Sequence, residues 1–361
     1  MRTIKKDDEA VVEVKEILTH FDVGKLITIE PNQRGFCNTS FNIVTEKDGQ
    51  KEKRFFRKYK QSIQEEELLF EHSLIEHLVL HRDLPVARLS QTKDGRTYTK
   101  RRGSKDYPLN NFYALFDFLP GEDRYTWVNP HCTHSELKNI ARIFALFHSA
   151  VSDFQPKAKR FEPKILELLS NLNNEIEQNP GKSKNTIFDE TLRRSQNAIQ
   201  VNIQTILHKL HEAEALQMPQ TVIHCDFHPG NLRFQRDSVS GLFDFDWSKV
   251  DFRCFDVGLA LWYFFTEWEG SQDGELRSGE ANFFLKEYQN AINQLPGIGP
   301  LNSIELEFLP LMISAGNFYI LNWTLLDYYS KEVDPVEYLK YLDHGIHFID
   351  RCGAKGIQNI I

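Results

Sequence analysis

The most informative segment of the chain is Val222-Ile-His-Cys-Asp-Phe-His-Pro-Gly-Asn-Leu-Arg-Phe234, in which a polar loop separates two apolar runs. The loop has the pattern His224-x-Asp226-x4-Asn231, and Asp244 follows thirteen residues after Asn231 in a second segment, Phe-Asp-Phe-Asp. Aspartate, asparagine, proline and glycine favour turns, so these residues could be ordinary loop formers. Two carboxylates and an amide occur here at one combined spacing, and a chance match is a weak explanation for that pattern.

The spacing of Asp226, Asn231 and Asp244 is that of the catalytic loop and metal-binding segment of kinases. Transfer of a phosphoryl group requires an oriented hydroxyl and cations that neutralise the phosphate oxygens. Asp226 is placed to accept the hydroxyl proton. Mg²⁺ prefers hard oxygen ligands, which Asn231 and Asp244 would provide. We therefore predict a catalytic loop at 222–234 and a metal-binding segment at 241–248.

The first third of the chain reads as strands with one helix. Two β-prone runs, 41–45 and 54–59, flank the dipeptide Asp48-Gly49, which is a hairpin signal. Apolar residues at helical spacing predict a helix within 63–81. Further strands are expected at 86–91, 97–100 and 112–119.

After Pro120-Gly121 the pattern becomes helical, beginning with a capping box between Thr133 and Glu136. A long helical insert is expected at about 154–216, short strands at 221–223, 232–234 and 241–245, and a last helix from Asp334-Pro335. This layout predicts an α+β chain with a bilobal protein-kinase-like fold. A small antiparallel-sheet N-lobe with one helix would occupy 1–118, a hinge 114–121, and a larger, mainly helical C-lobe 119–361.

The composition excludes several classes of protein. The 361 residues carry a formal net charge of −8, which does not favour a nucleic-acid partner because such binding needs clustered Lys and Arg. The five cysteines form no C-x-x-C pair, which argues against a disulfide framework or a structural zinc site. The N-terminus has no apolar core segment, and no membrane span is evident, so we expect a cytoplasmic protein. No feature indicates an oligomeric state.

These motifs resemble the aminoglycoside phosphotransferase and choline kinase superfamily, and the N-terminal half is most similar to type II homoserine kinases. The family's His-x-Asp-x4-Asn loop is followed by an acidic pair and by an Asp-Val/Leu-Ala signature, which matches Asp256-Val-Gly-Leu-Ala260 here. The resemblance implies Asp226 as the catalytic base and Asn231 and Asp244 as metal ligands. It implies a structural role for Asp256.

The resemblance also implies nucleotide-binding parts in the N-lobe. The segment Gly35-Phe-Cys-Asn38-Thr39-Ser40 is similar to the loop that covers the phosphates, although it has one glycine rather than several. Arg57 occupies the register of the cation that contacts the α and β phosphates, with Lys58 adjacent as the alternative, because strand alternation lets only one face the cleft. Glu71 resembles the helix glutamate that pairs with this cation. The segment 114–121, with Phe116 and Phe118, resembles the hinge that meets the adenine.

Other polar residues near these motifs have simpler interpretations. We expect His224 and His148 to be structural or core residues, and Cys225 to be a buried small hydrophobe. His228 and Asp246 are accessory candidates. For His228, an exposed loop histidine is the preferred interpretation over a contact with substrate or phosphate. For Asp246, a second metal contact and a loop-stabilising hydrogen bond stay equally open.

The sequence therefore predicts an ATP- and Mg²⁺-dependent kinase that phosphorylates a hydroxyl group on a small molecule. The acceptor could be an amino acid such as homoserine, an amino alcohol, a sugar or an aminoglycoside, and the C-lobe matches no pattern that chooses among them. A non-catalytic binding protein on a kinase scaffold is the alternative. A protein kinase is disfavoured, since no Ala-Pro-Glu segment follows Asp244 and Asp-Phe-Asp lacks the usual glycine.

Overall fold

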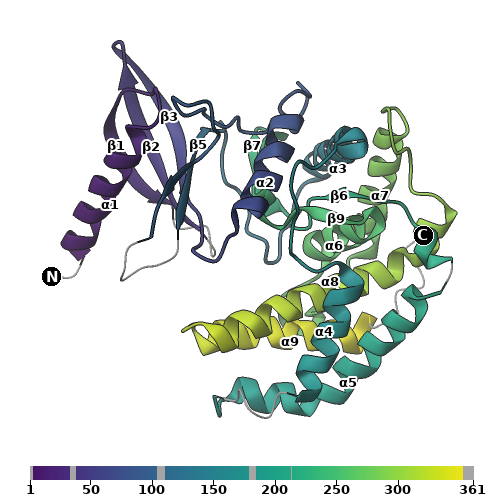
Figure 1. Cartoon of the computed structure of the whole chain (residues 1–361). Helices are drawn as coiled ribbons and strands as arrows, with labels where there is room; N and C mark the ends of the chain where they lie inside the picture. The colour runs from purple at the N-terminus through teal and green to yellow at the C-terminus, as the bar shows by residue number, and fades with distance from the viewer. Residues whose placement is uncertain (1–2, 33–37, 104–109, 179–183, 213, 353–361) are drawn as a thin grey trace. The chain divides into compact units, whose positions relative to one another are not determined.

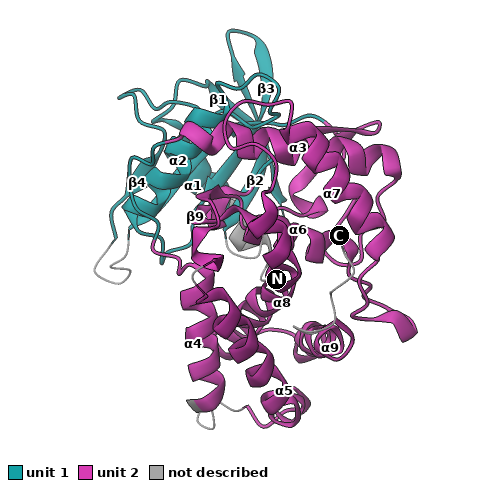
Figure 2. Ribbon diagram, turned by 90° about the vertical axis from the view of Figure 1, so that its right-hand side faces the viewer, with its two compact units in different colours: residues 1–120, 155–160, 241–243 teal, residues 121–154, 161–240, 244–361 magenta. Residues whose placement is uncertain are grey.

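The computed structural model describes residues 3–32, 38–103, 110–178, 184–212 and 214–352 (Figure 1). These residues form two compact units, coloured separately in Figure 2. The first unit contains residues 1–120, 155–160 and 241–243, and the second contains residues 121–154, 161–240 and 244–361. The predicted α+β class is confirmed, because an antiparallel sheet builds the N-terminal part and helices dominate the rest.

The first unit is built on a five-stranded antiparallel sheet in the order β1-β2-β3-β5-β4. Its elements are α1 (Thr3–Leu18), β1 (Lys25–Asn32), β2 (Thr39–Lys47), β3 (Gln50–Lys58), α2 (Glu65–Leu78), β4 (Thr99–Arg101) and β5 (Asn111–Asp117). The predicted hairpin is β2–β3, and both turn residues, Asp48 and Gly49, have positive φ angles, as a tight hairpin turn requires. One apolar side of this sheet is buried against α1 through Val14, Ile17 and Leu18.

The second unit is mainly helical. Its helices are α3 (His134–Ala150), α4 (Ile165–Gln178), α5 (Ile187–Leu210), α6 (Arg253–Phe265), α7 (Ser278–Ile292), α8 (Ser303–Ser330) and α9 (Pro335–Cys352). The predicted capping box starts α3, where Thr133 accepts from the amide of Glu136 and the Glu136 carboxylate accepts from the amide of Thr133. Helices α4, α5, α8 and α9 pack together on one side of this unit (Figure 1).

Two short antiparallel pairs of strands position the polar loops. Strand β6 (Gln220–Ile223) pairs with β9 (Lys249–Phe252), and β7 (Leu232–Gln235) pairs with β8 (Ser238–Leu242). In the first pair, Ile223 lies opposite Lys249. Residues that follow β6 and residues that precede β9 therefore leave the pair at the same end, which is where both acidic segments lie.

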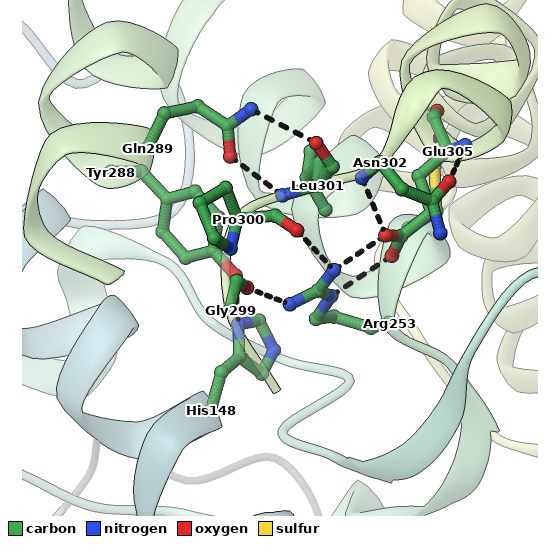
Figure 3. A network of polar contacts seen from close by, with 10 residues as sticks. His148, Arg253, Tyr288, Gln289, Gly299, Pro300, Leu301, Asn302 and Glu305 are labelled. Carbon is green, nitrogen blue, oxygen red and sulfur yellow. Dashed lines mark hydrogen bonds and ion pairs between the residues drawn. The ribbon is translucent and has the colours of Figure 1, made fainter. Parts of the chain in front are cut away.

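A buried polar network ties the start of α6 to the start of α8 (Figure 3). The Arg253 guanidinium donates to the Glu305 carboxylate and to the carbonyls of Gly299 and Pro300. Both charged side chains are almost fully buried, at 1% and 0% exposure. Buried charges require such close partners, since removing one would leave the other without compensation.

Several predicted elements differ from the structure. Helix α1 and strands β1 and β9 were not predicted. With α1, the described residues of the first third form two helices rather than one. The segment 86–91, expected to be a strand, has isolated bridges at Val86 and Leu89 and belongs to none of the named strands. The strand expected at 241–245 is displaced toward the N-terminus as β8, and Phe245 instead begins a short 3₁₀ turn.

Helix α8 is long and apolar enough to cross a membrane by length and composition. Of its most apolar window, however, 72% is buried inside the chain, as for a core helix of a folded domain. It packs extensively against α6 and α9.

Candidate active site

The backbone of the predicted catalytic loop is held by Asp256 on α6. One carboxylate oxygen of Asp256 accepts from the amide of Cys225 at 2.8 Å, and the other accepts from the amide of His224 at 2.8 Å. The same oxygen that meets His224 also lies 3.1 Å from Nε2 of His148. The Nδ1 atom of His148 lies 2.8 Å from the hydroxyl of Tyr288 on α7. A buried chain of polar groups thus anchors the loop to α3, α6 and α7.

This anchoring explains an unusual backbone conformation. Cys225 has φ of 63°, in the left-handed region that side chains other than glycine rarely adopt. The two hydrogen bonds to Asp256 compensate for that conformation, which turns the chain sharply just before Asp226. Cys225 itself is completely buried, as predicted, and burial raises the pKa of its thiol to about 12.

Asp226 is the centre of the site, because both of its carboxylate oxygens have donors. The Asn231 amide donates to Oδ2 at 2.8 Å and to the Asp226 backbone carbonyl at 2.9 Å. The Tyr263 hydroxyl donates to Oδ1 at 2.9 Å. Burial by itself would raise the pKa of Asp226. The nearby His228 ring, with Nε2 3.5 Å from Oδ2, and the hydrogen bond from Tyr263 outweigh it and leave this pKa below its ordinary value.

The orientation of Asn231 suits a cation ligand. Because its Nδ2 atom donates twice toward Asp226, its amide oxygen faces the other way, and no residue in the described part of the chain donates a hydrogen bond to that oxygen. A hard, neutral oxygen of this kind is what Mg²⁺ or Ca²⁺ binds. Among the described histidines, cysteines and acidic residues, no cluster of three or more is placed to hold a metal ion.

Asp244 and Asp246 lie in the segment between β8 and β9. Asp244 has φ of 69°, again in the left-handed region, and Asp246 is part of the 3₁₀ turn that follows. The segment packs against the catalytic loop: the Phe245 ring lies 5.0 Å from the His224 ring, and the Ser248 hydroxyl donates to the His224 carbonyl at 3.3 Å. The described contacts therefore join Asp226 directly to Asn231, and they join the Asp244 segment to the same loop through its neighbours.

The two loop histidines are both buried. His224 is completely buried and is surrounded by the rings of Phe147, Phe227 and Phe245, which fits the structural role expected of it. The expectation that His228 is exposed is wrong, since it is only 8% exposed. Its Nδ1 atom accepts from the Gly230 amide at 3.0 Å, so the ring proton is on Nε2, which lies 3.5 Å from Asp226. The ring is covered because it packs against the Tyr263 ring, with the two ring centres 4.9 Å apart.

In the first unit, the structure separates the two candidate cations of β3. The Arg57 guanidinium lies 3.3 Å from the Glu71 carboxylate of α2, and both side chains are buried. Lys58 points to the other side of the strand, where its ammonium group contacts Glu13 of α1 at 2.8 Å. The predicted ion pair with Glu71 therefore belongs to Arg57 and not to Lys58.

The other predicted nucleotide-binding residues lie in the same unit. Gly35 falls outside the described residues. Asn38 accepts from the Lys60 amide at 2.9 Å, and Thr39 begins β2. Phe116 is buried in β5 beside Phe55, and Phe118 follows the strand, with the Lys53 ammonium group 5.6 Å from its ring.

Tyr263 is the site residue that the sequence did not single out. It lies in an apolar run, Leu261-Trp-Tyr-Phe-Phe265, whose members are all buried. Tyr263 follows Asp256 by seven residues, or two helical turns, which places both side chains on one face of α6. This spacing was the feature of the sequence that could have identified Tyr263 as a site residue.

The chain is similar to known phosphotransferases and kinases over most of its length. Residues 28–289 match the model of the phosphotransferase enzyme family. The chain belongs to this family. A homoserine kinase from Bradyrhizobium sp. (strain ORS 278) is 25% identical over 345 residues, covering 93% of each chain, and one from Rhizobium etli (strain CFN 42) is 27% identical, covering 96% of each. The predicted family is confirmed, and this phosphotransferase acts on a hydroxyl group.

Solved structures show the same fold at lower identity. A microcompartment-associated aminopropanol kinase superposes with a TM-score of 0.64 at 16% identity, covering 95% of this chain and 96% of the other. An amicoumacin kinase, solved with AMP-PNP and Ca²⁺, superposes with a TM-score of 0.66 at 14% identity, covering 100% and 98%. The predicted protein-kinase-like fold class is confirmed.

Proposed function

We propose that this phosphotransferase moves the γ-phosphoryl group of ATP to the hydroxyl of a small molecule, with Mg²⁺ as the metal and Asp226 as the base. The observation that carries the proposal is the fixed carboxylate of Asp226. Asn231 donates a hydrogen bond to one of its oxygens and Tyr263 donates to the other. The loop that carries Asp226 is anchored by Asp256. Phosphoryl transfer depends on positioning and on charge more than on covalent chemistry. The fixed carboxylate of Asp226 would position the acceptor hydroxyl.

In the proposed reaction, Asp226 accepts the proton of the acceptor hydroxyl while the hydroxyl oxygen forms a bond to the γ-phosphorus. The bond from that phosphorus to the bridging oxygen breaks, and ADP leaves. Asn231, through its outward amide oxygen, and Asp244 would hold the metal, which when bound neutralises phosphate charge. Because the pKa of Asp226 lies below its ordinary value, the carboxylate is ionised and is a weak base, whose main task is to orient the hydroxyl.

The first unit would bind the nucleotide. Arg57 is the proposed contact with the α and β phosphates, because its guanidinium is fixed by Glu71 and a planar fork of donors matches phosphate oxygens. The backbone of 35–40 would cover the phosphates, with Gly35, Asn38 and Thr39, and the segment around Phe116 and Phe118 would meet the adenine. The AMP-PNP bound to the amicoumacin kinase supports ATP as the donor.

The acceptor is proposed to carry an amino group, as homoserine and aminopropanol do in the names of two relatives. Aromatic rings are connected to Asp226 through Tyr263: Trp127 lies 6.2 Å from Tyr263 and 4.9 Å from Tyr341, measured between ring centres. A protonated amine is attracted to aromatic faces. An amino acid or amino alcohol is therefore favoured over a plain sugar.

The test is a screen of amino acids, amino alcohols, sugars and aminoglycosides with ATP and Mg²⁺, scored by acceptor-dependent release of ADP. Asp226→Asn should lower turnover by at least about 10²-fold, which is the usual contribution of a positioned base. Binding of ATP with Mg²⁺, followed as a rise in melting temperature, should persist in this variant.

Asp237→Asn is the matched control, because Asp237 is an exposed aspartate in the turn between β7 and β8. It should keep wild-type turnover. Full activity of Asp226→Asn would refute the assignment of the base. Absence of any nucleotide-induced stabilisation in the wild-type chain would refute kinase activity itself.

A further inference from the structure

Tyr263 has a geometry that an ordinary core tyrosine lacks. Its side chain is buried, at 4% exposure, yet its hydroxyl reaches the carboxylate of Asp226, 37 residues away in sequence, at 2.9 Å. Asn231 donates to the other oxygen of that carboxylate at 2.8 Å. Tyr263 thus donates to one oxygen and Asn231 to the other, beside which Nε2 of His228 also lies at 3.5 Å, so the carboxylate plane has a single preferred orientation.

The ring of Tyr263 is itself fixed by its neighbours. The His228 ring lies 4.9 Å away, the Trp262 ring 5.5 Å and the Trp127 ring 6.2 Å, the last at an interplanar angle of 87°. Contacts on several sides leave the phenol few rotamers. Burial and the charge of Asp226 also raise the pKa of Tyr263 well above its ordinary value, so the hydroxyl keeps its proton and remains a donor.

We propose that Tyr263 is a positioning residue for phosphoryl transfer, which aims the Asp226 carboxylate at the acceptor hydroxyl. The proposal rests on the proposed role of Asp226 as the base. A base must lie within hydrogen-bond reach of the proton that it removes, and small errors of position are costly in rate. Tyr263 acts through Asp226.

Trp127 extends this arrangement toward the rest of the second unit. Besides Tyr263, its ring contacts the rings of Trp268 at 5.1 Å and Trp323 at 6.1 Å. An acceptor lying on these half-buried rings would therefore contact the residues that fix Tyr263. This packing provides a physical route by which binding of the acceptor would steady the carboxylate.

The test is Tyr263→Phe, which removes one hydroxyl and keeps the ring. We expect kcat to fall about tenfold or more, with the KM for ATP unchanged, since a misplaced base slows the chemical step without affecting nucleotide affinity. Tyr329→Phe is the matched control, because the Tyr329 hydroxyl also donates to an aspartate, Asp189, at 2.8 Å, in a part of the second unit without a described contact to Asp226. It should keep wild-type kcat.

A double-mutant cycle separates positioning from a structural role. In the Asp226→Asn background, the further change Tyr263→Phe should cost no additional turnover, because its target is already gone. If turnover of Asp226→Asn is too low to measure, the crystal structure of Tyr263→Phe decides. A rotated Asp226 carboxylate supports the proposal, and an unmoved one overturns it.

Other outcomes are equally direct. A Tyr263→Phe variant with kcat within twofold of wild type overturns the inference while leaving the base assignment intact. The inference also fails if the KM for ATP rises as much as kcat falls, or if the loss persists in full without the Asp226 carboxylate. An active Asp226→Asn variant would instead refute the proposed function on which the inference rests.

Discussion

At the scale of single residues, the two cationic side chains at the end of β3 are neighbours in sequence but have different partners. Arg57 and Lys58 are adjacent and alike in charge, but the alternation of the strand sends them to opposite faces. Arg57 meets Glu71, which is 1% exposed, whereas Lys58 forms a partly exposed pair with Glu13. A buried carboxylate depends far more on its partner than an exposed one.

We therefore predict that Glu71→Gln raises the KM for ATP by about tenfold, because a guanidinium without its anionic partner is no longer held in one orientation. Lys58→Gln, the matched control on the same strand, should leave this KM within about twofold, since its partly exposed ion pair lies on the other face of the strand and contributes little. Steady-state kinetics with varied ATP measures both. Equal effects of the two substitutions would show that Arg57 is not the phosphate contact.

At the scale of elements, the close approach of α6 and α8 places the site. Helix α6 carries both Asp256 and Tyr263, and glycines let α8 come near it. A Cβ atom on Gly258 would lie 2.6 Å from the backbone carbon of Met312 and 2.8 Å from the nitrogen of Ile313. Backbone atoms cannot move aside like the end of a side chain, so the crossing requires glycine at this position.

Gly258→Ala is accordingly expected to lower the free energy of unfolding by about 2 kcal/mol, the usual cost of overpacking, and to lower turnover by shifting α6. The control is Gly279→Ala in α7, where nothing lies within 4 Å of the added methyl group. There alanine should raise stability by up to about 1 kcal/mol through its higher helix propensity. Urea unfolding measures both, and a stable Gly258→Ala would disprove the tight crossing.

At the scale of the whole molecule, buried histidines make stability depend on pH. His148 on α3 forms a hydrogen bond with Asp256. His344 on α9 forms one with Asp273, with 2.6 Å between Nδ1 and the carboxylate oxygen. Burial lowers the pKa of both below 6.5, although the hydrogen bonds to their aspartates offset part of this effect. The unfolded chain therefore binds these protons more readily than the folded chain.

It follows that their stabilising contribution is complete above pH 6.5 and is lost as the pH falls toward the lowered pKa of the folded state. Each histidine contributes a slope of at most about 1.4 kcal/mol per pH unit. Urea midpoints measured from about pH 7.5 to about pH 5.5 should decrease, and less steeply in His344→Gln. A wild-type midpoint that rises on acidification would contradict the assigned direction.

Much of the architecture was predictable because its signals are local. Asp48-Gly49 marked the β2–β3 hairpin, and Thr133 with Glu136 marked the start of α3. Helix α1 was missed although Val14, Ile17 and Leu18 have helical spacing, because its charged beginning obscured the apolar face. Strand β9 was missed because a four-residue strand is recognisable only by its partner, β6.

The sequence by itself determined the family, the fold class and the chemical character of the loop. The spacing of Asp226, Asn231 and Asp244 along the chain is typical of this family and is visible without a structure. Tertiary structure alone decided that Arg57 rather than Lys58 meets Glu71, that His228 is buried, and that Tyr263 reaches Asp226. The reason is physical: spacing along a chain is set by covalent geometry and local propensity, whereas the partner of a side chain depends on which distant elements pack against it.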